Sequence, residues 1–223
     1  MQNKKGGMIQ RESGVWIRDG FHEDDTRELA RLARKYRMHG SLQSWGETIY
    51  NMTVDGPVNT AGTAASMLAS PKITLTERFW SMHKAVRISA WGRMSSVITT
   101  PGTARFDVRQ PSPTIIWDSL AVLLDTVAAH VTMPWRLMID LVCRAEGATG
   151  NLFGSGEFKY EGILGTPATM PKGSLTAMLP WNTAPVVSGN FDTAPANALD
   201  VFFTQTVATG SMTCHGCTIE SLN

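Results

Sequence analysis

The sequence predicts a mainly β protein: an antiparallel jelly-roll sandwich that follows an N-terminal arm with one short amphipathic helix. Three observations support this fold. From about residue 48 onward, apolar residues recur at every second position, which is the period of strands with one buried face. Charged residues make up only 17% of the chain, while Thr, Ser, Ala, Gly and Pro are abundant, as in strands joined by tight turns. No strong helical pattern separates the strands, which favours antiparallel pairing.

We divide the chain into an arm at residues 1–47 and a jelly-roll β domain at residues 48–223. Residues 1–40 carry nine Lys or Arg against six Asp or Glu, whereas the remainder carries eleven against thirteen. Because the net charge of the whole chain is only +1, we expect no direct nucleic-acid binding. A basic arm on a slightly acidic body suits docking onto another protein.

The sequence also bears on localisation. It has no apolar run of about 18 residues, so no membrane span is expected. The basic first residues are not followed by the apolar segment of a signal peptide, which predicts synthesis and retention in the cytoplasm.

An amphipathic helix is expected at about residues 24–38. Asp24 and Asp25 supply an N-terminal cap, and apolar residues then fall at i, i+3, i+4 and i+7, on one face. Because a lone helix needs something to lie on, it either covers the domain's own sheet or packs on a neighbouring subunit or another protein. Its apolar face is too small to hold a bilayer well. The residues expected to contact a partner are Trp16, Ile17, Leu29, Leu32, Tyr36, Arg31 and Arg34.

Eight strand regions are expected in the β domain. Residues 85–90 and 104–109 alternate, and the turn residues between them predict that the two segments pair as a β-hairpin. The apolar residues from Trp135 to Cys143 share one face of another strand. Residues 165–198 are rich in Pro, Thr, Ala and Gly, which predicts a long loop with a functional or inter-subunit role. The expected strands are 48–54, 73–79, 84–95, 103–110, 114–125, 133–145, 151–161 and 199–220, the last containing two strands.

The cysteines are Cys143, Cys214 and Cys217, of which the last two form a C-x-x-C pattern. Residues three apart on a regular strand point to opposite faces, so these two thiols would not easily hold one ion. A zinc site would also need His215 and the distant Cys143 to converge. We therefore favour buried structural thiols over a metal site or a redox pair, and we expect no metal and no cofactor.

The sequence does not predict an enzyme. The five histidines are scattered without metal-binding spacing, and neither G-x-S-x-G nor a phosphate-loop pattern occurs. Polysaccharide hydrolysis would need paired acids, but the acidic candidates alternate with apolar residues and are expected on solvated strand faces. Glycan binding without cleavage stays open, because exposed Trp rings stack on sugars, although core packing or subunit contact is favoured for each Trp. The acids are Asp107, Asp118, Asp125 and Asp140, and the tryptophans are Trp45, Trp80, Trp91, Trp117 and Trp181.

Several short motifs in order across residues 48–223 resemble a family of virion structural proteins from tailed bacteriophages. No one motif is specific, but the ordered set is more specific than any member. The motifs are VRISAWGRMS at 86–95 with TTPGTARFDVR at 99–109, PWRL at 134–137 with CRA at 143–145, NLFGSG at 151–156, FDTA at 191–194 with ALD at 198–200, and TCH at 213–215 with the final LN at 222–223.

The resemblance implies a trimer-forming jelly roll on the phage particle, often a capsid decoration (cement) protein that is made in the host cytoplasm. Its expected partners are the major capsid protein and its own copies in a homotrimer, on the capsid exterior. The alternative is a head-fibre base, a tail adaptor or a receptor-binding spike. A spike would be expected to bind glycan through its tryptophans and the 165–198 loop.

Overall fold

A computed structural model describes residues 46–98, 100–110, 112–164 and 174–222, together with three short strands near the N-terminus. The chain divides into two units, Met1–Ser44 and Trp45–Asn223. In the first unit, β1 (Lys4–Lys5), β2 (Met8–Gln10) and β3 (Trp16–Arg18) form an antiparallel three-stranded sheet in that order. The helix expected at residues 24–38 lies outside the described residues, and the domain boundary stays a prediction.

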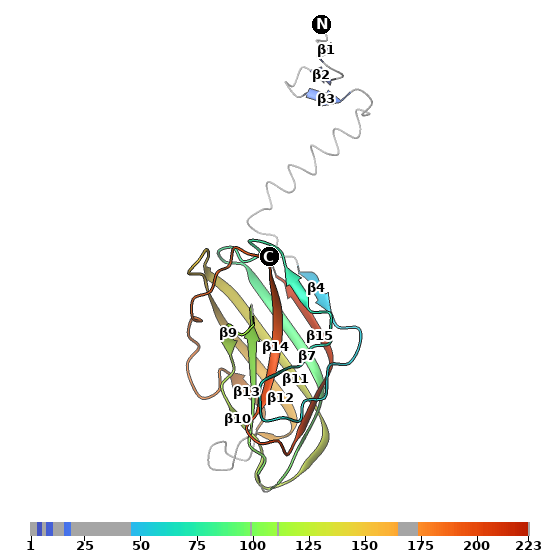
Figure 1. The fold of residues 1–223 in the computed structure, drawn as a ribbon, viewed down its shortest axis with the longest axis vertical. Coiled ribbons are helices and arrows are strands. Elements are labelled where there is room, and N and C mark those ends of the chain that lie inside the picture. The colour runs from blue at the N-terminus through green and yellow to red at the C-terminus, as the bar shows by residue number, and fades with distance from the viewer. Residues whose placement is uncertain are drawn as a thin grey trace. The chain divides into compact units, whose positions relative to one another are not determined.

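The second unit consists of two antiparallel six-stranded sheets, as expected for a β-sandwich (Figure 1). We call them the long sheet, ordered β13-β12-β11-β7-β15-β4, and the short sheet, ordered β10-β8-β14-β5 with β6 paired to β14 and β9 paired to β8. The strands of the long sheet are β4 (Glu47–Asn51), β7 (Ala85–Ser96), β11 (His130–Ala145), β12 (Asn151–Leu164), β13 (Ser174–Leu179) and β15 (Ser211–Ser221). Those of the short sheet are β5 (Ala65–Ser66), β6 (Ile73–Leu75), β8 (Thr103–Arg109), β9 (Ile115–Asp118), β10 (Val122–Leu123) and β14 (Asn197–Gln205).

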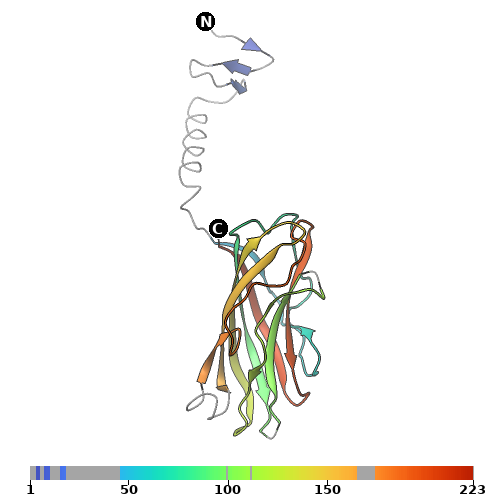
Figure 2. The same cartoon turned by 90° about the vertical axis from the view of Figure 1, so that its left-hand side faces the viewer.

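The last two strands return to pair with the first two long ones. β15 pairs with β7 in the long sheet, with Ile219 opposite Ile88, and β14 pairs with β8 in the short sheet, with Phe203 opposite Phe106. This rolling of one two-stranded ribbon against another is the wrapping expected of a jelly roll. The mainly β, antiparallel sandwich is thus confirmed, and its long strands extend along most of this unit (Figure 2).

The predicted β-hairpin is wrong. β7 and β8 have the expected residues, but they lie in different sheets. A period of two shows that each segment is a strand with one buried face, but it does not identify the neighbouring strand. The loop expected at 165–198 also contains a strand, β13, which pairs with β12 at the margin of the long sheet.

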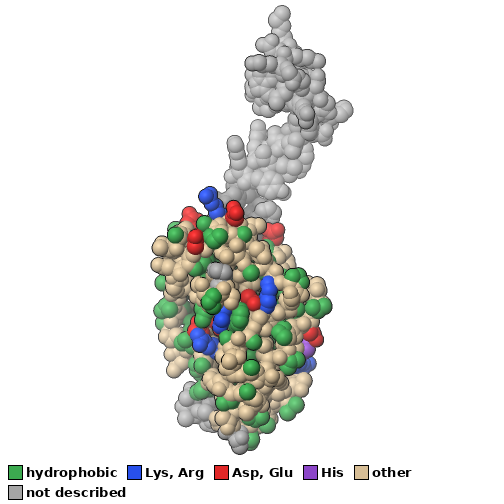
Figure 3. Space-filling view, in the orientation of Figure 1, with side chains coloured by type: hydrophobic (Ala, Val, Ile, Leu, Met, Phe, Trp, Pro, Cys, Tyr) green, Lys and Arg blue, Asp and Glu red, His purple; other side chains and the backbone are tan. Residues whose placement is uncertain are grey.

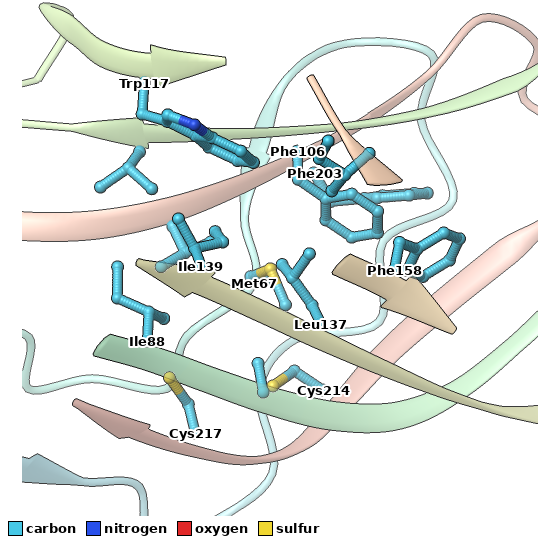
Figure 4. Close-up of a cluster of buried hydrophobic side chains, with 14 of the residues drawn as sticks. Met67, Ile88, Phe106, Trp117, Leu137, Ile139, Phe158, Phe203, Cys214 and Cys217 are labelled. Carbon is cyan, nitrogen blue, oxygen red and sulfur yellow. The ribbon is translucent and has the colours of Figure 1, made fainter. Parts of the chain in front are cut away.

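The core lies between the sheets and comes from the residues that alternation predicts. The apolar face of β11 from Trp135 to Cys143 is fully buried, as are Val86, Ile88 and Ala90 of β7. Aromatic rings fill the middle, where the ring centroids of Phe106 and Phe158 lie 4.8 Å apart (Figure 4). Within the described residues, no helix is long and apolar enough to cross a membrane.

Candidate functional site

The predicted partner-contact residues lie in the first unit. Trp16 and Ile17 belong to β3, where they are paired in register with Gln10 and Ile9 of β2. The other members of the set lie outside the described residues; these are Leu29, Leu32, Tyr36, Arg31 and Arg34. Their role as contacts therefore stays a prediction.

An apolar groove of about 420 Å³ lies between β9 and the segment 180–189. Its exposed side chains include Leu120, Val186 and Val187, and Val186 is 73% exposed. Two backbone hydrogen bonds hold the segment 180–189 in place. The Ser188 N–H donates to the Leu152 carbonyl at 2.7 Å, and the Trp181 N–H donates to the Ser119 carbonyl at 2.7 Å. A preformed apolar groove with a fixed backbone is typical of surfaces that bind another molecule.

The outer face of the short sheet carries ion pairs. Arg105 Nε lies 2.9 Å from Asp118 Oδ1, and Arg109 Nη2 lies 3.1 Å from Asp107 Oδ2. Hydrogen bonds to these carboxylates raise the pKa of both arginines above the ordinary value, although burial lowers it. The Arg109 guanidinium also lies 4.0 Å from the ring centroid of Phe202. Basic and acidic side chains are accordingly intermixed on this side of the sandwich (Figure 3).

Two of the four acids predicted to be solvated are buried. Asp107 is only 1% exposed although it lies on the outer face of the sheet. Arg109, two residues further along the same face, binds its carboxylate and covers it. Asp107 and Asp118 are register partners, yet an arginine binds both oxygens of each carboxylate. These two acids serve as anchors for arginine, so neither carboxylate is free.

Asp125 is the second buried acid. Its carboxylate accepts hydrogen bonds from the Val127 N–H at 2.8 Å and the Ala128 N–H at 3.1 Å, and His130 Nε2 lies 3.0 Å from Oδ2. Burial raises the pKa of Asp125, but these three hydrogen bonds outweigh it and hold the pKa below the ordinary value. This cluster closes the turn that leads into β11.

The cysteines are free and buried, as predicted. The expectation that Cys214 and Cys217 point to opposite faces of their strand is wrong. A register shift between Cys214 and Gly216 forms a β-bulge in β15, so both Cys214 and Cys217 face the core (Figure 4). The bulge leaves His215 outside, where Nδ1 lies 3.0 Å from Asp55 Oδ1. Among the described residues, no group of three or more His, Cys, Asp or Glu side chains is placed to hold a metal ion.

The tryptophans fall into different environments. Trp80 and Trp117 are buried, and Trp181 packs partly against the core. Trp91 differs, because 44% of it is exposed on the outer face of the long sheet. Trp45 lies outside the described residues. The sequence identified the tryptophans as candidates, but it did not distinguish Trp91 from those that belong to the core.

Comparisons with known proteins identify no family for this chain. No family model matches it, and no curated protein matches it. Among solved structures, the CBM2 module of the evolved Dit of Lactobacillus casei BL23 phage J-1 is similar, with 11% identity and a TM-score of 0.32. The similarity covers 82% of this chain and 98% of the module. A similarity at this level supports no conclusion about the function of this chain.

Proposed function

We propose that this chain is a structural protein of a tailed-phage virion, which decorates the outer capsid shell as a homotrimer and stabilises contacts between capsomers. The proposal rests on the ordered motifs in residues 86–223. In the structure most of these motif residues belong to β7, β8, β11, β12, β14 and β15, the strands that build the sandwich, whereas FDTA at 191–194 lies in the segment before β14. The resemblance therefore mainly concerns the framework of the domain.

The division of the chain into two units supports attachment through the first of them. The second unit makes its own core: the cluster of buried apolar residues extends from Met52 to Ile219. We assign attachment to residues 1–44, because their basic excess and the apolar stripe expected on their helix suit a protein surface. Repetition over a capsid lattice makes many weak attachments act together, so avidity exceeds the affinity of one contact.

The apolar groove beside β9 supports a role in association. Exposed apolar residues that gather around a groove are more typical of contacts between chains than of an isolated surface. In a homotrimer such a groove would be covered by a neighbouring copy. The homotrimer is itself part of the proposal. The molecular mass of the purified protein in solution tests it.

Co-sedimentation tests the proposal. The full-length protein is mixed with phage heads that lack it and, separately, with isolated tails. Saturable binding to heads at a ratio comparable to that of the capsid subunits is the expected result. Binding to tails alone would contradict capsid decoration and support the alternative, a head-fibre base, tail adaptor or receptor-binding spike. Copy number per particle separates the two independently, since a decoration protein is present in hundreds of copies and a tail part in a few.

A further inference from the structure

The outer face of the long sheet places Trp91 in one row with two cations. Gly216 of β15 is the register partner of Trp91, Trp91 is the partner of Arg136 on β11, and Arg136 is the partner of Lys159 on β12. Directly opposed residues project from the same side of a sheet and are separated by about 5 Å per strand. The indole, the guanidinium and the ammonium group therefore form a row about 10 Å long across three strands.

Trp91 has a position that leaves one side of its ring open. A Cβ added at Gly216 would lie 2.2 Å from Trp91 Cζ2 and 2.3 Å from Cε2, so the indole lies over the backbone of that glycine. The β-bulge between Cys214 and Gly216 brings the glycine opposite Trp91. One part of the ring is thus supported from below, while 44% of the residue remains exposed. A supported, exposed indole is a stacking surface that loses little conformational freedom on binding.

Arg136, the cation directly opposite Trp91, is available to a ligand. Arg136 is exposed and makes no ion pair with any residue that the structure describes. Lys159 forms an ion pair with Glu157, with Nζ 3.2 Å from Oε1, but its side chain is 57% exposed. A hollow of about 130 Å³ lies between these side chains and Met138. Arg87 on the same face differs, because both oxygens of Asp140 already bind its guanidinium, at 2.7 and 2.9 Å. The free positive charge therefore lies next to the indole.

We propose that this row, Trp91–Arg136–Lys159, is a binding site for an acidic polysaccharide. A sugar ring stacks on the exposed indole through its C–H groups, and the carboxylate or phosphate groups of neighbouring sugars bind Arg136 and Lys159 through charge-assisted hydrogen bonds. The site does not depend on where the protein is attached to a particle, so the inference is separate from capsid decoration.

Two other occupants fit less well. Single-stranded nucleic acid is bound by several successive aromatic platforms in a strongly basic channel, whereas this row has one exposed indole in a chain of net charge +1. A second copy that met this face with its own equivalent face would bring like charges together, which costs free energy at a contact. A ligand in which sugar rings alternate with negative charges can stack on the indole and bind the cations at the same time.

Isothermal titration of the full-length protein tests the proposal. The acidic probes are polygalacturonate, polysialic acid and a glycerol-phosphate teichoic acid, and the neutral probe is dextran; a thymidine oligonucleotide tests the alternative. We expect saturable binding to at least one acidic polysaccharide and at least roughly tenfold weaker binding to dextran, because only the former engages the cations. The carboxylated and phosphorylated probes distinguish the two sources of negative charge.

Variants then assign the site. Trp91→Ala and Arg136→Gln are each expected to weaken binding of the acidic probe by roughly tenfold or more, since each removes a direct contact. Trp91→Phe keeps an aromatic surface and retains part of the affinity. Arg87→Gln removes the same charge from the same face and is expected to bind as the wild type. A thermal melt of each variant separates loss of binding from loss of folding.

Four results would overturn the proposal. These are the absence of binding to every acidic probe, equal binding to dextran, tighter binding to the oligonucleotide, and wild-type affinity in folded Trp91→Ala and Arg136→Gln proteins. None of these results depends on binding to phage heads, so the site and the capsid role are tested separately.

Discussion

The thiols of Cys214 and Cys217 face the same side of β15, although three positions separate them along the chain. On a regular strand these residues would point to opposite sides. The β-bulge between Cys214 and Gly216 adds one residue to the strand and returns Cys217 to the core side. The C-x-x-C pattern in this protein therefore reflects a bulged strand with two buried thiols, and the exposed residue of the pattern is His215.

We predict that these thiols are unreactive in the folded protein. Burial raises the pKa of Cys214 to about 11, and burial followed by the proximity of Cys214 raises the pKa of Cys217 as well. Because the thiolate is the reactive form, neither side chain reacts appreciably at pH 8. Titration with Ellman's reagent is expected to detect almost no thiol in the native protein and all three cysteines in denaturant. Rapid reaction of two thiols in the native state would contradict this burial.

We predict that Gly216→Ala destabilises the sandwich. The added Cβ would lie 2.2 Å from Trp91 Cζ2, so the indole must leave its place or the strands must separate. Overpacking of this kind costs about 1–3 kcal/mol of unfolding free energy. Gly189→Ala is the matched control, because a Cβ at Gly189 meets no atom within 4 Å. Urea denaturation of both variants gives the comparison.

A double-mutant cycle identifies the cause of that loss. If the clash with the indole is responsible, Trp91→Ala should suppress most of the cost of Gly216→Ala, and the two changes should be strongly non-additive. Additive effects would instead show that the backbone of the bulge, and not the ring, requires glycine at position 216.

We predict that Asp125 stabilises the protein at neutral pH and ceases to do so in acid. The hydrogen bonds from Val127, Ala128 and His130 hold its folded-state pKa below the ordinary value of 3.8, so folding favours the carboxylate. The unfolded chain binds the proton more readily, and the stabilisation is full above about pH 5 and is lost as the pH falls through the folded-state pKa.

Asp125→Asn measures this contribution. The variant loses the negative charge and is expected to be less stable than the wild type by about 1–3 kcal/mol at pH 7, because a buried charge-assisted network is broken. The difference should shrink as the pH is lowered through 4 towards 2. Asp192→Asn is a suitable control, since Asp192 is exposed and its carboxylate bonds a single backbone N–H, that of Ala194. A stability difference that is independent of pH would contradict the prediction.

Alternation predicted the strands because it depends on one segment at a time. The buried faces of β7, β8, β11 and β14 follow directly from residues such as Ile88, Phe106 and Val201. The pairing of β7 with β15 instead of β8 depends on the closure of the whole sandwich, which no local pattern records. The burial of Asp107 was missed for a related reason: Arg109 neutralises it on the outer face, so polarity alone did not indicate solvent.

To predict the row Trp91–Arg136–Lys159, the register of the strands must be known as well as their positions in the sequence. The sequence identified Trp91 among five tryptophans, but its position beside Arg136 and Lys159 arises from the pairing of three strands that are distant in sequence. The support from Gly216 depends further on the bulge in β15. A one-residue change of register would have turned these side chains to the other face.

The last prediction concerns the first unit. We predict that residues 45–223 fold alone, with an unfolding temperature close to that of the full chain, because their apolar core extends from Met52 to Ile219. If residues 1–44 tether the protein to the capsid, the truncated protein should keep its oligomeric state and lose binding to heads. The full-length variant with Leu29→Asp and Leu32→Asp is the matched test, because it keeps the arm and removes only the expected apolar stripe. Full-strength binding of the truncated protein to heads, measured by sedimentation, would refute the tether. Failure of residues 45–223 to fold, measured by thermal melting, would refute the self-sufficient core.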